Sequence, residues 1–406
     1  MTLTTARPPQ TSRGAAPPAI LPATVLATVV LITAIAPLAT DMYVPAFPLV
    51  ARDLATSATE VQLTLTTFFV GMALGQLVGG PVSDRAGRRR PLLISLVVLT
   101  AASALCAFSP TIGVLMVARL VQGFSGGWAM VIARSVVVDL TSGTRLVRAM
   151  NLVAGVAGIA PIVGPLLGAA VLQLSHWRVS FWVVAALAAV MVVTVAVAVP
   201  ETARREPTRF AGEVLRNRGF LGYLVVFSFS MGTIFAYVAT SAFVLQSMNG
   251  LSPVAYSVDF AVNAVGLTVA TLVAARLAGR VPTRQLVLVG LVATGLAGVV
   301  LLVGALWFGM PLPVALLGFF VLMSAQGLVG PNAGALASAQ VPEHPGTGSA
   351  VLGFLQWCMA GVVAPLAGLG GERTAVPMAA IVLALTAFSL LALIVNQRGS
   401  QPCVES

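Results

Sequence analysis

Long apolar runs, separated by short polar segments, dominate the pattern along this chain. Ile20–Ala39, Pro91–Phe108 and Val179–Val199 are clear examples. Each is close to the length of about 20 residues with which an α-helix crosses the core of a bilayer. In hydrocarbon the backbone must satisfy its own hydrogen bonds, which leaves helices or closed barrels. Because no segment alternates apolar and polar residues at period two, the pattern predicts an all-α integral membrane protein.

The apolar blocks predict twelve transmembrane helices, six before and six after the most charged stretch, Glu201–Gly219. The spans are 20–47, 61–83, 91–109, 111–138, 149–173, 178–199, 220–246, 256–278, 284–306, 312–335, 347–370 and 375–396. Six plus six spans around a polar linker indicate two parallel repeats of a transporter fold. We therefore expect a disordered cytoplasmic tail (1–19), an N-terminal six-helix bundle (20–199), a cytoplasmic linker (200–219), a C-terminal six-helix bundle (220–397) and a cytoplasmic tail (398–406).

Composition and charge exclude further classes of protein. Only 8% of the 406 residues are charged, against about 25% in soluble domains. All basic residues are arginines, and with the N-terminus inside, seventeen of them fall on the tails and inner loops. The outer loops hold three, Arg52, Arg178 and Arg373. Cytoplasmic loops collect basic residues, so we expect a multi-pass inner-membrane protein with both termini cytoplasmic. The same placement explains the net charge of +10 without a nucleic-acid partner.

The loop between the second and third spans reads Gly80-Pro-Val-Ser-Asp84-Arg85-Ala-Gly87-Arg88-Arg89-Arg90. Its arginines alone are typical of a positive-inside loop. The ordered set of glycines, acid and bases resembles the signature G-x-x-x-D-R-x-G-R-R of the major facilitator superfamily. That resemblance implies the major facilitator fold, and a cytoplasmic gate in which Asp84 and Arg88 hold helix ends together. It also implies that Asp84 faces the N-terminus of a neighbouring helix and that Arg88 pairs with Asp139.

Two further motifs lie inside spans. Arg119-Leu-Val-Gln122-Gly123-Phe-Ser-Gly126 resembles a fourth-helix motif of the family, R-x-x-Q-G-x-x-G, whose arginine is linked to proton coupling. An arginine at that depth indicates a functional site, with snorkelling to the interface as the alternative. Gly164-Pro165-Leu-Leu-Gly168-Ala169 resembles the antiporter motif G-P-x-x-G-G, with alanine at the last position. That motif is associated with exporters; small residues can also serve helix packing alone.

The first span ends with Asp41-Met-Tyr-Val-Pro45-Ala-Phe-Pro48, and Asp41 is the clearest acid inside a span. An intramembrane carboxylate indicates an ion or proton path, and a capping or interfacial role is the alternative. The run D-x-Y-x-P-x-x-P is similar to the bicyclomycin-resistance (Bcr/CflA) branch of drug exporters. Shorter similarities, such as Pro200-Glu201-Thr202, extend from about residue 30 to residue 370. Some relatives carry a second acid two turns earlier, where this chain has Thr33.

These patterns predict proton-coupled efflux of drugs or other small amphipathic molecules. Asp41 and Arg119 are the expected coupling residues, and Tyr237, Asn263 and Gln356 are candidates for lining the cavity. We expect no metal, no other cofactor and a monomeric protein in the bilayer. A proton-coupled importer of a small metabolite is the main alternative, although spans with few carboxamides disfavour a sugar site.

Two other classes fit the sequence less well. An enzyme is suggested only by the G-x-S-x-G pattern at Gly123–Gly127, which lies in an apolar helix without a nearby histidine base. A receptor that keeps a transporter fold would be indicated by loss of Asp41, Arg119 or the signature loop, all of which are present.

Overall fold

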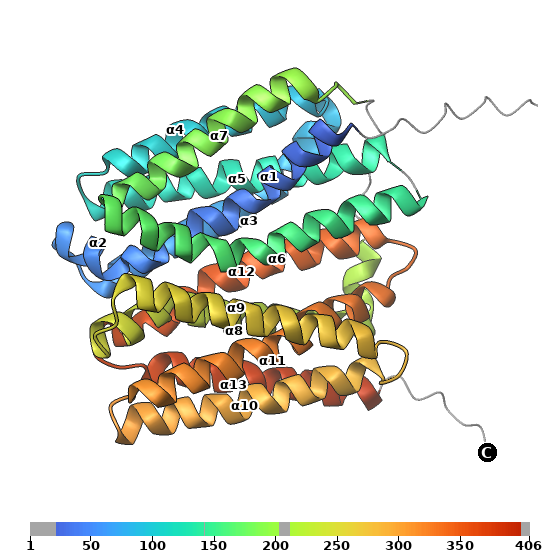
Figure 1. Ribbon diagram of the computed structural model, residues 1–406. Coiled ribbons are helices and arrows are strands. Elements are labelled where there is room, and N and C mark those ends of the chain that lie inside the picture. The colour runs from blue at the N-terminus through green and yellow to red at the C-terminus, as the bar shows by residue number, and fades with distance from the viewer. Residues whose placement is uncertain (1–21, 142, 203–211, 399–406) are drawn as a thin grey trace, which may run out of the picture.

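The computed structural model describes residues 22–141, 143–202 and 212–398. The predicted tail at 1–19 and residues 399–406 of the predicted C-terminal tail lie outside this range. So does part of the predicted linker, residues 203–211. Within it the chain is built of helices, and these form two halves of six long helices each, stacked on one another (Figure 1).

The N-terminal half contains the first seven α-helices and one short 3₁₀ helix. These are α1 (Ala23–Asp41), η1 (Val44–Ala46), α2 (Phe47–Asp53), α3 (Ala58–Ala86), α4 (Arg89–Phe108), α5 (Ile112–Leu140), α6 (Gly143–Leu174) and α7 (Arg178–Ala198). Ser57 begins α3 with a capping box, because its hydroxyl accepts from the Glu60 amide while the Glu60 carboxylate accepts from the Ser57 amide. This polar start accounts for a helix that begins three residues before the predicted span 61–83.

The C-terminal half repeats the arrangement with six long helices. It contains η2 (Gly212–Arg216), α8 (Arg218–Ala242), η3 (Phe243–Met248), α9 (Pro253–Leu277), α10 (Thr283–Trp307), α11 (Leu312–Ala339), α12 (Pro345–Ala367), η4 (Gly368–Gly370) and α13 (Val376–Arg398). Ser252 caps α9, with Pro253 in its first turn, so this helix begins three residues before the predicted span. The segment η3 is a π-helix that continues α8 and ends it.

The described helices confirm the fold class predicted from the apolar pattern. Eleven of them have the length and composition of a membrane span. The twelfth is α6, which is 32 residues long and contains the apolar stretch Gly158–Leu174. Valine and leucine side chains on the outside of the bundle are widely exposed in the isolated chain, as on α10, where Leu296 is 64% exposed. Such a surface suits lipid and not water.

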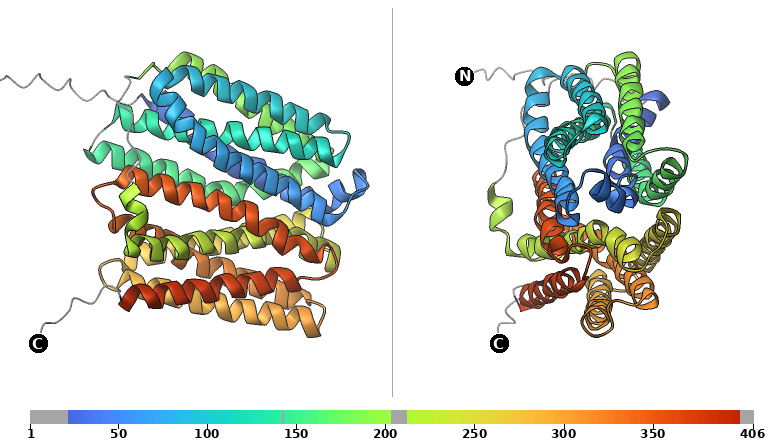
Figure 2. Two further views of the ribbon diagram at one scale, coloured as in Figure 1. Left: turned by 180° about the vertical axis from the view of Figure 1, so that it is seen from behind. Right: turned by 90° about the vertical axis from the view of Figure 1, so that its left-hand side faces the viewer.

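The two halves meet along two helix pairs. α3 packs against α12, and α6 packs against α9. Both described chain ends, the start of α1 and the end of α13, lie at the same end of the molecule as the turn between α3 and α4 (Figures 1 and 2). We call this the termini end and the opposite end, which carries α2, the α2 end.

Candidate functional site

The candidate site begins where α1 breaks. After Asp41 the chain leaves the α-helix, because the Tyr43 amide bonds to the Thr40 carbonyl 3.0 Å away and not to that of Ala39. Asp41 is therefore held at a helix end inside the bundle, with only 6% of its surface exposed. The one described hydrogen bond to its carboxylate comes from the Thr40 hydroxyl, 3.1 Å away. Among the described residues Asp41 has no ion pair.

Arg119 on α5 contacts the backbone of α1 next to this break. Its Nη1 donates to the Ala39 carbonyl at 3.1 Å and to Oε1 of Gln122 at 2.7 Å. Its guanidinium also lies over the Phe68 ring, 4.2 Å from the centroid, which stabilises a cation in an apolar environment. Arg119 is fully buried, so the snorkelling alternative is wrong. No described contact joins it to the Asp41 carboxylate, and its hydrogen bond to α1 is made to the Ala39 carbonyl.

Two glycines of α6 pack against the backbone around Asp41. A Cβ atom on Gly164 would lie 2.8 Å from the Asp41 Cβ. A Cβ on Gly168 would collide with the Met42 carbonyl oxygen. Pro165 lies between them in the buried face of the helix. The pattern that resembles the antiporter motif thus lets α6 approach the backbone around Asp41 more closely than any residue with a side chain would allow.

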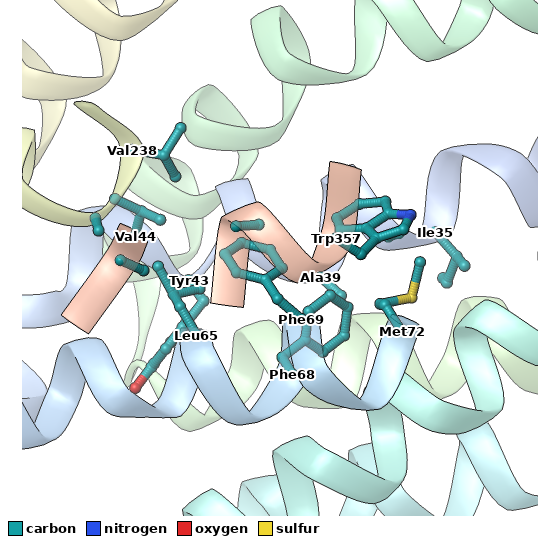
Figure 3. Close-up of a cluster of buried hydrophobic side chains, with 14 of the residues drawn as sticks. Ile35, Ala39, Tyr43, Val44, Leu65, Phe68, Phe69, Met72, Val238 and Trp357 are labelled. Carbon is teal, nitrogen blue, oxygen red and sulfur yellow. The ribbon is translucent and has the colours of Figure 1, made fainter. Parts of the chain in front are cut away.

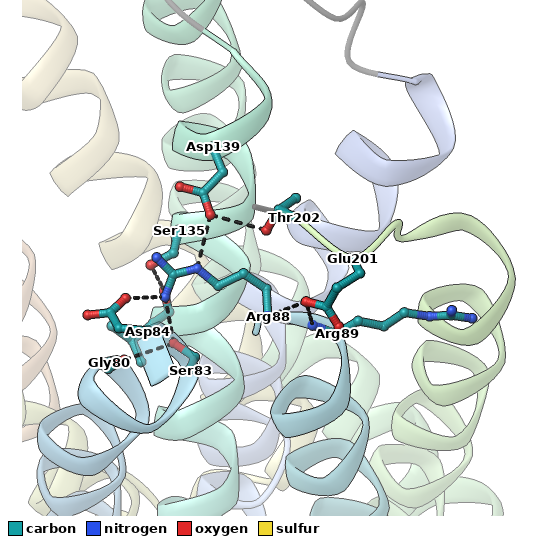
Figure 4. A network of polar contacts seen from close by, with 10 residues as sticks. Gly80, Ser83, Asp84, Arg88, Arg89, Ser135, Asp139, Glu201 and Thr202 are labelled. Carbon is teal, nitrogen blue, oxygen red and sulfur yellow. Dashed lines mark hydrogen bonds and ion pairs between the residues drawn. The ribbon is translucent and has the colours of Figure 1, made fainter. Parts of the chain in front are cut away.

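A second polar cluster lies at the termini end, in the turn between α3 and α4 (Figure 4). Nη1 of Arg88 contacts the Asp84 carboxylate at 2.5 Å, and its Nε contacts Asp139 on α5 at 3.0 Å. The Ser83 hydroxyl lies 2.7 Å from the same guanidinium. Burial alone would lower the pKa of Arg88, but the carboxylates of Asp139 and Asp84 outweigh it and hold that pKa above its ordinary value. The cluster joins α3, the turn and α5 within the N-terminal half.

The structure adds a residue that the sequence motifs left out of this cluster. Glu201, just after α7, accepts hydrogen bonds from the backbone amides of Arg88 at 2.6 Å and Arg89 at 3.2 Å. It therefore satisfies the N-terminus of α4, where a carboxylate is favoured. Gly87 has φ +87, and a Cβ there would lie 2.5 Å from Glu201 Oε1. Glycine suits this position because the positive φ is unfavourable for other residues and because Glu201 leaves no space for a Cβ atom.

The other members of the signature loop have different surroundings. The contact that the resemblance implied between Arg88 and Asp139 is present. Asp84 was expected to face a helix N-terminus, but its described partner is Arg88, and Glu201 holds that place on α4. Gly80 has open space around its Cβ position, and Arg85 is exposed.

Contacts between the halves gather at the α2 end. Nε2 of Gln62 donates to the Ala239 carbonyl at 3.0 Å, and Nε2 of Gln246 donates to the Pro45 carbonyl at 3.0 Å. The Phe47 ring lies 5.8 Å from that of Phe243. These contacts join the two halves at the α2 end.

An aromatic cluster continues this junction toward the middle of the molecule (Figure 3). Phe69 of α3 lies 4.6 Å from the Phe235 ring and 5.7 Å from that of Trp357. Phe235 and Trp357 come from α8 and α12, and their own rings are 5.7 Å apart. These large rings stand scattered in the sequence, with no motif to relate them.

Of the three candidate cavity residues, the structure brings two together. Nδ2 of Asn263 lies 3.0 Å from the Tyr237 hydroxyl, and both residues are fully buried between α8 and α9. Gln356 lies on α12 without a described hydrogen bond to either. The sequence motifs gave no sign of Asp259 on α9, which bonds to Asn263 at 2.9 Å. The apolar run placed it at the edge of a span, whereas the capped helix begins earlier.

A wide apolar pocket lies between the halves on their lateral side. It has a volume of about 650 Å³ and is bounded by α6, α9 and α11. Its lining is almost wholly aliphatic, with Leu166 from the N-terminal half facing Val262 and Val265 of the C-terminal half. Pockets of this size and character suit small apolar or amphipathic ligands.

Comparison with known proteins decides what this arrangement is. The model of the Major Facilitator Superfamily matches residues 29–365. The chain belongs to the Major Facilitator Superfamily. It is a multi-pass membrane transporter, and the alternative reading of Gly123–Gly127 as an enzyme is wrong. Within the superfamily fold, Ser125 of that pattern is a helix residue whose hydroxyl bonds to the Val121 carbonyl at 2.8 Å.

Individual relatives agree with the family. The MFS-type transporter YdgK of Bacillus subtilis is 35% identical over 367 residues, covering 88% of this chain and 91% of the relative. The bicyclomycin resistance protein homolog of Haemophilus influenzae is 29% identical over 379 residues, covering 90% and 94%. The multidrug resistance protein MdtL of Escherichia coli matches at 28% over 239 residues, 57% of this chain and 61% of that protein. The resemblance drawn from the sequence motifs is thereby confirmed.

Solved structures agree on the fold. A bacterial homolog of the human lysosomal transporter Spinster superposes with a TM-score of 0.75, at 14% identity and covering 94% of this chain and 98% of that one. The D-xylose-proton symporter superposes with a TM-score of 0.70, at 15% identity and covering 93% and 97%. At these identities the likeness shows the twelve-helix fold of the superfamily alone.

The arginine cluster of the signature loop leads to a testable difference between two neighbouring residues. Arg88→Ala removes the partner of two carboxylates, and a buried acceptor left without its donor costs about 1–3 kcal/mol. We expect a lower melting temperature of the purified protein and loss of transport. Arg90→Ala is the matched control, since Arg90 is exposed in the same turn without a described partner. Equal behaviour of the two variants would mean that the loop only orients the chain in the membrane.

Proposed function

We propose that this transporter exports drugs or other small amphipathic molecules across the cytoplasmic membrane in exchange for protons, by alternating access. The observation that carries the proposal is the Asp41 carboxyl, which is buried in a membrane-spanning half at a break in α1 and has no cationic partner among the described residues. An ion or a substrate can drive a conformational change only through different affinity for the two states. A lone intramembrane carboxyl supplies such a difference, since its charge changes when it binds a proton.

Export is favoured over import of a sugar by how the polar side chains are used. Two of the amides inside the spans are engaged in packing, since Gln62 bonds to the other half and Gln122 bonds to Arg119 and to Ser103. The apolar pocket between α6, α9 and α11 offers almost no polar group. The names of the Haemophilus and Escherichia relatives, with bicyclomycin and multidrug resistance, point the same way.

Orientation follows from the arginines. With both termini cytoplasmic, the termini end and the Asp84–Arg88–Asp139 cluster face the cell interior, and the junction at the α2 end closes the protein toward the outside. In this orientation Asp41 lies behind the closed outer junction, where release of a drug and uptake of a proton would follow when that junction opens. We further propose that the unit that performs this cycle is a monomer.

The proposal is tested by expressing the full chain in a bacterium lacking its main efflux pumps. Minimal inhibitory concentrations are measured for a panel of amphipathic antibiotics and cationic dyes, beside an empty vector and Asp41→Asn. We expect the wild type to raise resistance to some members of the panel and the variant to behave as the vector. Increased uptake of a panel compound, abolished by the same variant, would instead indicate the importer.

The orientation gives its own prediction. A reporter that is active only in the cytoplasm should be active when fused after Arg398, and a reporter that is active only outside should be active when inserted at Gly371 between η4 and α13. The reason is that the wrong orientation would expose seventeen arginines outside and three inside. A periplasmic C-terminus would contradict the twelve-helix topology with both termini inside.

A further inference from the structure

A second carboxyl lies inside the membrane-spanning bundle, in the C-terminal half. Asp259 stands two turns into α9, half-buried, and its one described hydrogen bond is with Nδ2 of Asn263 at 2.9 Å. No described cation contacts it. The helices around α9 supply none: α11 and η3 contain no charged or titratable residue, and the only charges of α6, Arg145 and Arg148, lie at its opposite end.

A continuous run of buried polar groups begins at this carboxyl. The Asn263 amide that contacts Asp259 also lies 3.0 Å from the Tyr237 hydroxyl on α8. The Ser241 hydroxyl lies one turn further along α8, on the same face of the helix as Tyr237. Ser241 bonds to the Tyr256 hydroxyl at 3.0 Å. Together these groups connect α8 and α9 within the C-terminal half.

The run ends beside the first helix of the other half. Tyr256 is fully buried, and its helix α9 packs against η1, the short helix that follows Asp41 in the N-terminal half. The only titratable groups described around Asp259 are Tyr237, Tyr256 and, beyond Tyr256, Asp41. Among the described residues neither carboxyl has an arginine partner. Screening by water is weak inside the bundle, so charges there interact more strongly than they would in water.

The surroundings of Asp259 determine what it can bind. The Tyr237 ring packs against Phe260 at 5.3 Å and against Phe319 at 5.2 Å, and all three are buried. These rings fill the space between α8, α9 and α11. A proton needs no free volume beside these rings.

We propose that Asp259 is a second proton-binding carboxyl, coupled to Asp41 across the interface between the halves through Tyr256 and its hydrogen-bonded neighbours. An O–H bond forms on the Asp259 carboxylate when the site is open to the side of higher proton activity and breaks when it opens to the other. Each half then contributes one carboxyl to the cycle. The role of this proton in transport rests on the proposed function, but its binding does not.

The test uses protons alone as the ligand, so it is independent of any drug. The purified full-length protein is reconstituted in lipid, and pH-dependent infrared difference spectra of its carboxyl groups are recorded. The variants are Asp259→Asn, Asp41→Asn and Asp259→Glu, with Asp53→Asn as control. Asp53 is a half-exposed carboxylate at the α2 end that is paired with Arg178 at 2.5 Å. Melting temperatures establish that each variant is folded.

We expect Asp259→Asn to remove one titrating carboxyl band and to shift the titration midpoint of the band that Asp41→Asn removes. Asp259→Glu should restore a titrating band, and Asp53→Asn should leave the Asp41 midpoint in place. An Asp259→Asn protein with every titrating band of the wild type would overturn the proposal, since Asp259 would then be only a hydrogen-bond partner of Asn263. Loss of the band with an unchanged Asp41 midpoint would overturn the coupling. The spectra can be recorded even if the drug panel finds no substrate. A failure of the export proposal can therefore be told apart from a failure of the proposal for Asp259.

Discussion

Asp41→Asn should leave a folded transporter that carries its substrate only down the substrate's own concentration gradient. Asparagine has nearly the same shape as aspartate and can still accept the hydrogen bond from Thr40, so the break in α1 and its contacts with α6 should persist. What disappears is the group whose charge changes with protonation. Substrate affinity then no longer depends on a proton at this position, and the proton gradient loses its means of biasing the cycle.

The expected size of this effect follows from the proton gradient. One proton moving down a difference of one pH unit supplies about 1.4 kcal/mol, which sustains about a tenfold gradient of exported substrate. In inverted membrane vesicles with an imposed pH difference and no membrane potential, wild-type protein should reach at least that gradient. The variant should equilibrate at about equal concentrations on both sides. Efficient exchange of labelled for unlabelled substrate by the variant would show that its binding site survives.

One result would contradict this mechanism directly. If Asp41→Asn still built the wild-type gradient with undiminished proton flux, Asp41 would be a structural cap at the end of α1, and the coupling group would lie elsewhere. The control is Asp53→Asn, which removes a carboxylate from the same end of the molecule but from an ion pair with Arg178.

Gly168→Ala should abolish transport and lower the melting temperature, whereas Gly158→Ala in the same helix should do neither. A Cβ at position 168 would collide with the Met42 carbonyl oxygen, which belongs to the backbone and cannot rotate away. A Cβ at position 158 meets nothing within 4 Å. Overpacking of this kind costs about 1–3 kcal/mol. It also pushes α6 away from the segment of α1 that holds Asp41.

Both variants make the same chemical change, and alanine is a better helix former than glycine at either position. Their comparison therefore isolates the close approach between α6 and α1. Thermal unfolding of the purified proteins and resistance assays in cells are the two measurements. Equal stability and equal resistance would mean that α6 can shift without cost, and that Gly168 does not set the position of Asp41.

Much of the architecture could be read from the chain because the bilayer restricts the choices. A run of about 20 apolar residues has few alternatives to a membrane-spanning helix, so every predicted span corresponds to a described helix. Errors occur at the ends, where polar residues extend a helix. The Ser252 cap adds three residues before the predicted span 256–278. Asp259 therefore lies two turns into α9 and not at its edge.

Motifs located part of the candidate site in the same way. Asp41, Arg119, Gly164 and Arg88 each stood out, because charges and glycines inside or beside apolar runs are rare and have specific physical uses. Their spacing did not reveal which of them touch. Arg119 bonds to the Ala39 carbonyl and not to the Asp41 carboxylate, and the N-terminus of α4 is held by Glu201 and not by Asp84.

By itself the sequence determined that this protein crosses the membrane twelve times, with two six-helix halves and a charged turn between its second and third spans. These features depend on local composition, since the cost of leaving a backbone group or a charge in hydrocarbon applies to each segment independently. Only the tertiary structure decided that Gly164 faces Asp41, that Phe69 meets Phe235 and Trp357, and that Ser241 bonds to Tyr256. Those contacts join residues far apart in the chain, and they depend on how neighbouring helices rotate and approach each other, which no single segment encodes.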